Sequence, residues 1–320
     1  MVSNTTPLTS LDMSPWTGRI DPEANSERWH QKIQPLTEAA PSGCALLGFE
    51  SDAGVARNKG RTGAVQGPAA MRQALAPLAW HRHAPAYDAG NIRCEDDALE
   101  SAQQQLADRV AELLEAGHLP IVMGGGHEVA FGSWSGLAQY LHPQGEPAPH
   151  IGIINFDAHF DLRDPSHVHS SGTPFAQIAH ECAQRHWPFK YACLGVSRAA
   201  NTQALFNRAA QLDVLVREDR DFQPEQMSDI RRDLKSFIDA CDHLYLTLDL
   251  DVLPAAEAPG VSAPAARGVS LSLIEPLIDL IRDSGKLRLA DIAELNPQHD
   301  IDNRTARAAA RVIFQLALER

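Results

Sequence analysis

The chain has 320 residues, of which 44% are hydrophobic, and it carries a formal net charge of -13. This length and apolar content suffice for a large core, and one α/β sheet of this size can form a single domain. The negative charge argues against a nucleic-acid partner, whose phosphates would be repelled, although an acidic protein can still hold a local basic pocket for a small anion.

Nothing in the sequence indicates a membrane or a disulfide framework. No stretch approaches eighteen uninterrupted apolar residues, and residues 1–21 are polar, without a basic start followed by an apolar core. The five cysteines are widely spaced and contain no Cys-x-x-Cys pair. We therefore expect a soluble, cytoplasmic protein with reduced cysteines.

Apolar runs alternate with helical patterns along the chain. Residues 1–40 form an N-terminal extension in which Trp16 and Trp29 indicate packing against a domain formed by residues 41–320. Runs that predict short buried strands lie at residues 45–49, 121–123, 151–156, 191–196, 214–216, 244–250 and 287–292. Helical patterns lie at residues 97–116, 227–240 and 303–319, with Asn303 as the N-cap of the last. The alternation predicts one three-layer α/β/α domain with a mostly parallel sheet.

Carboxylates and imidazoles gather at the ends of three predicted strands. They are His127, Asp157, His159, Asp161, Asp249 and Asp251. In the second and third of these segments they recur with period 2, so on an extended backbone they point to one side. Any one of these segments could be a surface loop with ordinary acidic residues. All three, however, place such groups at the end of a buried strand, where a charge needs a partner. A carboxylate-rich set of oxygen and nitrogen ligands favours two hard divalent ions such as Mn2+ or Mg2+.

Four motifs, in this order, resemble the ureohydrolase family of arginases, agmatinases and formimidoylglutamases. They are Gly-Gly-Gly-His-Glu at 124–128, Asp-Ala-His-Phe-Asp at 157–161, Thr-Leu-Asp-Leu-Asp at 247–251 and Glu-Leu-Asn-Pro at 294–297. The resemblance runs from about Gly43 to the C-terminus and implies an arginase-like fold. It also implies that the six side chains hold two Mn2+ ions, with Asp157 and Asp249 bridging. The resemblance names the metal, which the spacing alone leaves open.

Two ions that share bridging carboxylates lower the pKa of a water molecule between them and so supply hydroxide near neutral pH. In the ureohydrolases this nucleophile attacks an amidine or guanidine carbon, and the resemblance implies that Glu294 pairs with the cationic nitrogens of the substrate. Asp161, a ligand with a second oxygen, is a candidate to relay a proton to the leaving amine.

Positions at which this chain differs from arginases and agmatinases indicate the substrate. Ser171 stands where arginases and agmatinases have a histidine, and the Gly-Gly-Gly-His-Glu variant and residues 54–61 resemble formimidoylglutamases. The implied reaction is hydrolysis of N-formimino-L-glutamate to L-glutamate and formamide, a step of histidine degradation. An agmatinase or guanidino-acid ureohydrolase is the alternative, and a non-catalytic metal-binding relative is a second one.

A dicarboxylate substrate requires cationic donors, and the guanidinium group of arginine matches a carboxylate best. The candidate substrate-binding residues are Arg57, Arg61, Ser171, Arg198 and Asn201. Lys59 and Arg163 are further candidate cations for the substrate carboxylates. A solvated loop is the alternative interpretation of residues 57–61, since exposed basic loops are common. We also expect the chain to form a homo-oligomer.

Overall fold

The computed structural model describes residues 11–142 and 148–319. Within them, nine strands form one sheet in which every strand pairing is parallel. The strands are Gln34–Pro35 (β1), Cys44–Glu50 (β2), Ala86–Arg93 (β3), Leu119–Met123 (β4), Ile151–Phe156 (β5), Lys190–Val196 (β6), Leu215–Glu218 (β7), His243–Asp249 (β8) and Leu287–Ala293 (β9). Their order across the sheet is β1-β3-β2-β4-β9-β8-β5-β6-β7.

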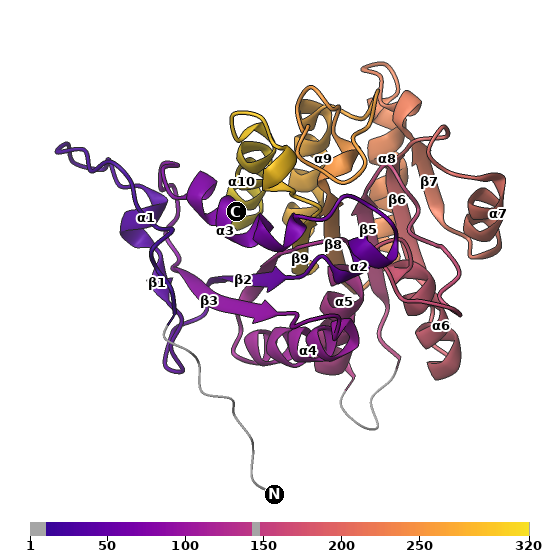
Figure 1. Ribbon diagram of the computed structural model, residues 1–320, viewed down its shortest axis with the longest axis horizontal. Helices are drawn as coiled ribbons and strands as arrows, with labels where there is room; N and C mark the ends of the chain where they lie inside the picture. Colours follow the sequence, from indigo (N-terminus) through magenta and orange to yellow (C-terminus); the bar gives the residue numbers. More distant parts are fainter. Residues whose placement is uncertain (1–10, 143–147, 320) are drawn as a thin grey trace, which may run out of the picture.

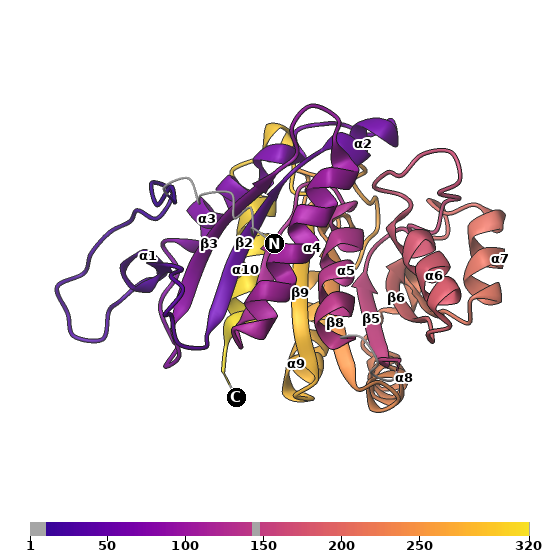
Figure 2. The same cartoon turned by 90° about the horizontal axis from the view of Figure 1, so that it is seen from below.

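Helices cover both faces of this sheet (Figures 1 and 2). The α-helices are Trp29–Lys32 (α1), Ala53–Arg57 (α2), Gly67–Leu75 (α3), Leu99–Glu115 (α4), Val129–Leu141 (α5), Pro174–Arg185 (α6), Gln203–Gln211 (α7), Met227–Asp239 (α8), Leu271–Asp283 (α9) and Arg304–Ala317 (α10). Short 3-10 turns occupy Ala64–Gln66, Asp219–Asp221, Leu250–Val252 and Pro297–His299. The predicted three-layer α/β/α fold class is confirmed.

Two hydrophobic cores lie on the two faces of the sheet. Alternate residues of β5 belong to different cores. Ile154 lies in the core that includes residues of α3, α8, α9 and α10, whereas Ile153 lies in the core that includes residues of α4, α5 and α6. Because both faces of the central strands are covered, these strands are mostly apolar, with Asn155, Thr247 and Asp291 as buried polar exceptions. This is why the continuous apolar runs in the sequence predict them correctly.

Two strands, β1 and β3, are absent from the sequence-based prediction. β3 carries Asp88 within its buried half, and a charge there argues against a strand. The structure pairs this carboxylate with Arg72, whose Nε lies 2.7 Å from Asp88 Oδ2, and with Trp16, whose Nε1 donates at 2.7 Å. The buried ion pair, formed with a residue of α3, makes the charge tolerable.

Residues 11–43 lie along one edge of the sheet, where β1 pairs with β3. Trp16 and Trp29 are both buried there. The division of the chain at residue 40 stays a prediction. No helix in the described part of the chain is long and apolar enough to cross a membrane.

Asn303 occupies the predicted N-cap position of α10, but its side chain makes no capping hydrogen bond. Asp300 caps the helix instead, since its carboxylate oxygens accept from the amides of Thr305 at 3.0 Å and Ala306 at 3.1 Å.

Candidate metal centre

The sheet order places the predicted ligands at one edge. β4, β9, β8 and β5 are consecutive neighbours, and all run in the same direction. The chain continues from the carboxyl end of β4 to His127, from β9 to Glu294, from β8 to Asp249 and Asp251, and from β5 to residues 157–161. Segments that are up to 167 positions apart in sequence therefore meet, as in the hydrogen bond from His127 N to Glu294 Oε1.

The glycine run before His127 allows this close approach. A Cβ atom on Gly125 would lie 1.7 Å from the carbonyl oxygen of Ser51 at the end of β2. The neighbouring Gly126 donates its amide to the same carbonyl at 3.0 Å. Only glycine fits here, and the tight turn places His127 directly after β4.

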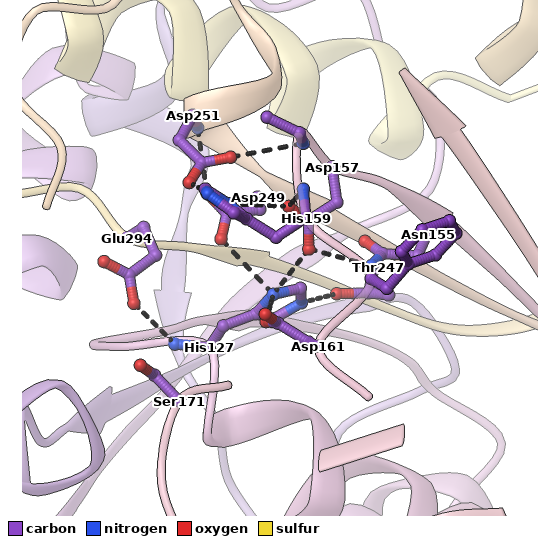
Figure 3. A network of polar contacts seen from close by, with 12 residues as sticks. His127, Asn155, Asp157, His159, Asp161, Ser171, Thr247, Asp249, Asp251 and Glu294 are labelled. Carbon is purple, nitrogen blue, oxygen red and sulfur yellow. Dashed lines mark hydrogen bonds and ion pairs between the residues drawn. The ribbon is translucent and has the colours of Figure 1, made fainter. Parts of the chain in front are cut away.

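His127 lies at the centre of a first cluster (Figure 3). Its Nδ1 lies 3.1 Å from Asp157 Oδ2, 2.9 Å from Asp161 Oδ2 and 3.3 Å from Asp249 Oδ2. One ring nitrogen carries at most one proton and could satisfy only one of three oxygens, and the structure gives this buried atom no hydrogen-bond partner. A bound cation satisfies all four atoms at once, so the donor set fits a metal ion.

A second cluster joins Asp157, His159 and Asp251. His159 Nδ1 lies 2.9 Å from Asp251 Oδ2 and 3.6 Å from Asp157 Oδ1. Asp157 therefore faces the two clusters with different oxygens, Oδ1 and Oδ2, which is the arrangement of a bridging carboxylate. Asp249 directs Oδ2 to the first cluster, while its Oδ1 accepts from Asp251 N at 2.8 Å. The bridging roles of Asp157 and Asp249 both stay predictions.

The clusters hold an excess of buried negative charge. Burial and the neighbouring Asp157 raise the pKa of Asp161 to about 6, and burial together with the charges of Asp251 and Asp157 raises the pKa of Asp249 well above its ordinary value. Within the described residues, no lysine or arginine pairs with any of these carboxylates. Cations held between them would remove this repulsion.

A cavity of about 320 Å³ opens onto these clusters. Its lining comprises Asn58, Lys59, Gly60, Arg61, His159, Asp161, Arg163, Ser171, Ala200, Asn201, Leu205, Asp249, Asp251, Ser262, Ala263 and Glu294. Three of the lining residues, Lys59, Asp161 and Glu294, are non-glycine residues with φ of 62°, 47° and 69°. Such conformations are costly and concentrate at functional sites, which agrees with the position of this cavity.

Glu294 combines burial with an unused hydrogen-bonding atom. Its Oε1 accepts from His127 N at 3.0 Å, whereas its Oε2 is buried without a hydrogen-bond partner in the described structure. Burial and the nearby Glu128 raise the pKa of Glu294 to about 8. A cationic group next to Glu294 favours its ionised form, so the carboxyl group is suited to pair with an amidinium nitrogen.

The predicted substrate-binding residues divide into two groups. Arg61, Ser171 and Asn201 line the cavity, whereas Arg57 and Arg198 do not. The Nε of Arg57 lies 3.0 Å from Asp97 Oδ1, and its Nη1 lies 2.7 Å from Glu100 Oε1. Arg198 donates from Nε to Glu218 Oε2 at 3.0 Å. These guanidinium groups are committed to carboxylates outside the cavity.

Two of the lining residues, Asn201 and Arg61, form hydrogen bonds with the protein backbone. Asn201 donates from Nδ2 to the carbonyl oxygens of Ala158 and Ser197, both at 2.8 Å, and accepts from the amide of Phe160 at 3.1 Å. It thereby shapes the segment that carries three ligands. Arg61 donates from Nε to the carbonyl oxygen of Ser262 at 3.0 Å.

Lys59 and Arg163 also line the cavity, and within the described residues no carboxylate pairs with either. Ser171, placed beside them, accepts from Asn58 Nδ2 at 3.2 Å. The lining of the cavity thus combines two cations without an ion pair in the described structure, several polar groups and candidate metal ligands. An anionic group of a substrate would complete this charge pattern.

Two residues that contact the ligands are missing from the sequence-based prediction. Asn155 donates from Nδ2 to Asp157 Oδ2 at 2.9 Å, and Thr247 Oγ1 lies 2.9 Å from His127 Nε2. Each lies two positions before a ligand on the same strand, so each projects from the same face of the sheet as that ligand. The period of 2 already used for the ligands would have identified them.

The chain belongs to the arginase family, whose family model matches residues 42–318. It is 58% identical over 310 residues to the formimidoylglutamase of Aeromonas hydrophila subsp. hydrophila, an alignment that covers 96% of this chain and 98% of the relative. It is 48% identical over 355 residues to the formimidoylglutamase of Photobacterium profundum, which covers 99% of this chain and 98% of the relative. The predicted family is confirmed.

Solved structures show the same fold. The formimidoylglutamase of Bacillus subtilis subsp. subtilis str. 168 matches with a TM-score of 0.81 at 22% identity and covers 94% of each chain. The formiminoglutamase of Trypanosoma cruzi with Mn2+2 matches with a TM-score of 0.76 at 25% identity, over 87% of this chain and 93% of that chain. The predicted arginase-like fold is confirmed.

Proposed function

We propose that this protein hydrolyses N-formimino-L-glutamate to L-glutamate and formamide, a step of histidine degradation. The observation that carries the proposal is one cavity lined by candidate metal-ligating carboxylates, by the acceptor Glu294 and by Lys59 and Arg163, for which the described residues show no ion pair. Formimidoylglutamases at 48% and 58% identity over nearly the whole chain support the same activity.

We further infer that the centre holds two Mn2+ ions. The six predicted side chains form two clusters that share Asp157, and the four carboxylates carry a charge that two divalent ions would balance. When bound, such ions supply charge neutralisation and activation of water near neutral pH. The Mn2+2 form of the Trypanosoma cruzi formiminoglutamase supports the choice of metal.

The protein side chains bind, orient and move protons around this centre. Lys59 and Arg163 bind the two carboxylates of the substrate, which places the formimino group at the opposite end of the cavity, beside Glu294. Glu294 pairs through Oε2 with a nitrogen of the amidinium group, orients the reacting carbon, and keeps this charge pairing in the transition state of water addition. Asp161 takes a proton from the water that adds to the carbon and passes it to the departing amino nitrogen of glutamate. The new carbon–oxygen bond then replaces the carbon–nitrogen bond, which leaves formamide and L-glutamate.

Substrate selectivity tests this assignment. Formiminoglutamate should be hydrolysed at least about 100-fold faster than agmatine, since each lost charge pairing costs about tenfold or more in rate, and agmatine presents a cation to Lys59 and Arg163. The measurement is kcat/KM with Mn2+ for formiminoglutamate, agmatine, arginine and guanidinobutyrate. Faster release of urea from agmatine would establish the alternative ureohydrolase activity, and absence of turnover on the whole panel would favour a non-catalytic relative.

Single substitutions test the carboxylate-binding role. Lys59→Ala and Arg163→Ala should each raise KM for formiminoglutamate by about 10- to 100-fold with a smaller effect on kcat, because a hydrogen bond to a charged group contributes about 1.5–3 kcal/mol. Lys235→Ala, at an exposed lysine paired with Asp239 on α8, is the matched control. If Arg198→Ala raised KM while Lys59→Ala and Arg163→Ala did not, the earlier sequence-based choice of Arg198 would be correct.

A cytoplasmic location and a homo-oligomeric state stay predictions. Size-exclusion chromatography coupled to light scattering measures the second directly.

A further inference from the structure

Glu128 follows the candidate ligand His127 in the chain and is buried, but it belongs to neither candidate metal cluster. Its Oε1 accepts from the hydroxyl group of Ser51 at 3.0 Å and from the amide of Gly54 at 2.9 Å. Its Oε2 is buried without a hydrogen-bond partner in the described structure. The side chain therefore connects the turn after β4 with the start of α2.

Two glycines leave the space that this carboxyl group occupies. A Cβ atom on Gly54 would lie 2.5 Å from Glu128 Cδ, and a Cβ atom on Gly126 would lie 2.1 Å from Glu128 Oε2. Neither position accepts a larger residue while Glu128 keeps its place. The start of α2 and the turn before His127 are thus both built around the Glu128 side chain.

The helix α2 depends on contacts from outside itself. It has five residues, and a helix of this length has little stability of its own in water. Its N-cap residue Asp52 makes no capping hydrogen bond with its side chain. Glu128, from a different element, satisfies the amide of Gly54 in the first turn. The position of α2 therefore depends on Glu128.

The backbone of α2 in turn holds one wall of the cavity. Three amides donate to carbonyl oxygens of the helix, each at 2.9 Å: Asn58 to Gly54, Lys59 to Ala56 and Gly60 to Val55. The three donor residues line the cavity. Lys59 has a φ of 62°, a conformation that persists only when the surrounding structure imposes it. A displacement of α2 would therefore also displace Lys59.

We propose that Glu128 is a positioning residue for substrate binding, which fixes α2 through Oε1 and thereby places Lys59 in the cavity. Asp52 closes the same segment at its other end, since its Oδ2 accepts from the amide of Gly63 at 2.7 Å. The inference rests on the proposed function, in which Lys59 binds a substrate carboxylate. The role requires only a hydrogen-bond acceptor at Oε1, which a neutral or an ionised carboxyl group provides.

Two variants of Glu128 separate the acceptor from the charge. Glu128→Gln keeps an oxygen that can accept from Gly54, whereas Glu128→Met is similar in size and has no such oxygen. We expect Glu128→Met to raise KM for formiminoglutamate by about 10-fold or more, with kcat within about threefold, because a misplacement of about 1 Å can cost about 100-fold. Glu128→Gln should stay within about threefold of the wild type in both constants.

Metal content and a control variant complete this comparison. The Mn2+ content of both Glu128 variants should equal that of the wild type, since Glu128 is outside the candidate clusters. Glu115→Met, at an exposed glutamate that ends α4, is the matched control and should leave kcat and KM unchanged. An effect exerted through the charge of Glu128 on the nearby Glu294 would instead be equal in Glu128→Met and Glu128→Gln.

Hydrogen–deuterium exchange of the full chain with Mn2+ reports on α2 without any substrate. In Glu128→Met the amides of residues 53–63 should exchange about tenfold faster than in the wild type, because the hydrogen bond that holds the segment is lost. The amides of residues 151–156 in β5 should be unchanged. Glu128→Gln should show wild-type exchange in both segments.

A wild-type KM in Glu128→Met would overturn the proposal, as would equal effects in Glu128→Met and Glu128→Gln. If Glu128→Met did not fold, Gly54→Ala would decide, because its Cβ atom forces α2 and the carboxyl group apart. A raised KM is expected for Gly54→Ala, and a wild-type KM would overturn the proposal. If the wild type did not hydrolyse formiminoglutamate, the proposed function would fail, while the exchange of residues 53–63 would still decide whether Glu128 positions this segment.

Discussion

Asp249→Asn is expected to reduce both bound Mn2+ and turnover by orders of magnitude. Asp249 Oδ2 lies 3.3 Å from His127 Nδ1 in the first cluster, and Oδ1 accepts from Asp251 N. An asparagine that kept the second contact would direct an amide group towards His127, which removes one negative charge and places hydrogen-bond donors where a cation should lie. Elemental analysis of the purified chain gives the metal content, and kcat/KM in excess Mn2+ gives the turnover.

The control for this substitution is Asp239→Asn, an exposed aspartate on α8 that pairs with Lys235. It removes the same charge from the surface, so metal content and activity should match the wild type. An Asp249→Asn variant that remained active with nearly two ions per chain would contradict the assignment of Asp249 as a ligand.

Glu294→Ala should lower kcat/KM by about a thousandfold or more while the metal content stays at the wild-type value. The expected loss corresponds to about 4 kcal/mol of transition-state stabilisation, which is comparable to the removal of one well-placed electrostatic group in other enzymes. Glu294 is not a member of either candidate metal cluster and contacts His127 only through the backbone amide, so its loss should act mainly on the substrate. Steady-state kinetics on formiminoglutamate at saturating Mn2+, with elemental analysis, measure both quantities.

Ser171→Ala is the companion variant, because Ser171 lines the same cavity but contacts only Asn58 in the described structure. Its loss should cost about tenfold in kcat/KM, or about 1.4 kcal/mol. Equal losses for Ser171→Ala and Glu294→Ala, with both metals retained, would make Ser171 a direct catalytic residue and would exclude the proton relay through Asp161.

The strands that carry the candidate ligands are predicted well because the pattern that identifies each one lies within its own few residues. An apolar run such as residues 151–156 is buried on both faces, and the polar period of 2 that follows it records the direction of each side chain. The strand β3, which lies between β1 and β2, is not predicted in this way. Asp88 is acceptable in it only because Arg72, on a different element, neutralises the charge.

The substrate-binding residues are predicted less well, because their positions also depend on residues that are distant in sequence. A long arginine side chain can turn towards or away from a cavity, and the choice depends on carboxylates far away in sequence. Arg57 forms ion pairs with Glu100 and Asp97 outside the cavity, and Arg198 forms one with Glu218. Arg163 lines the cavity, and in the described part of the chain no such carboxylate competes for it. Composition and spacing contain no information about these distant pairings.

The two oxygens of Asp157 point into different candidate metal clusters, so the proposed uptake of two ions should be coupled. An ion held by His127 through the first cluster must also polarise Asp157, whose other oxygen serves the cluster of His159. The two occupancies are therefore thermodynamically linked, and by reciprocity each ion alters the affinity for the other by the same factor. Titration with Mn2+ should accordingly deviate from the curve of two independent sites, and a half-loaded protein should be a distinct species rather than an average of empty and full molecules.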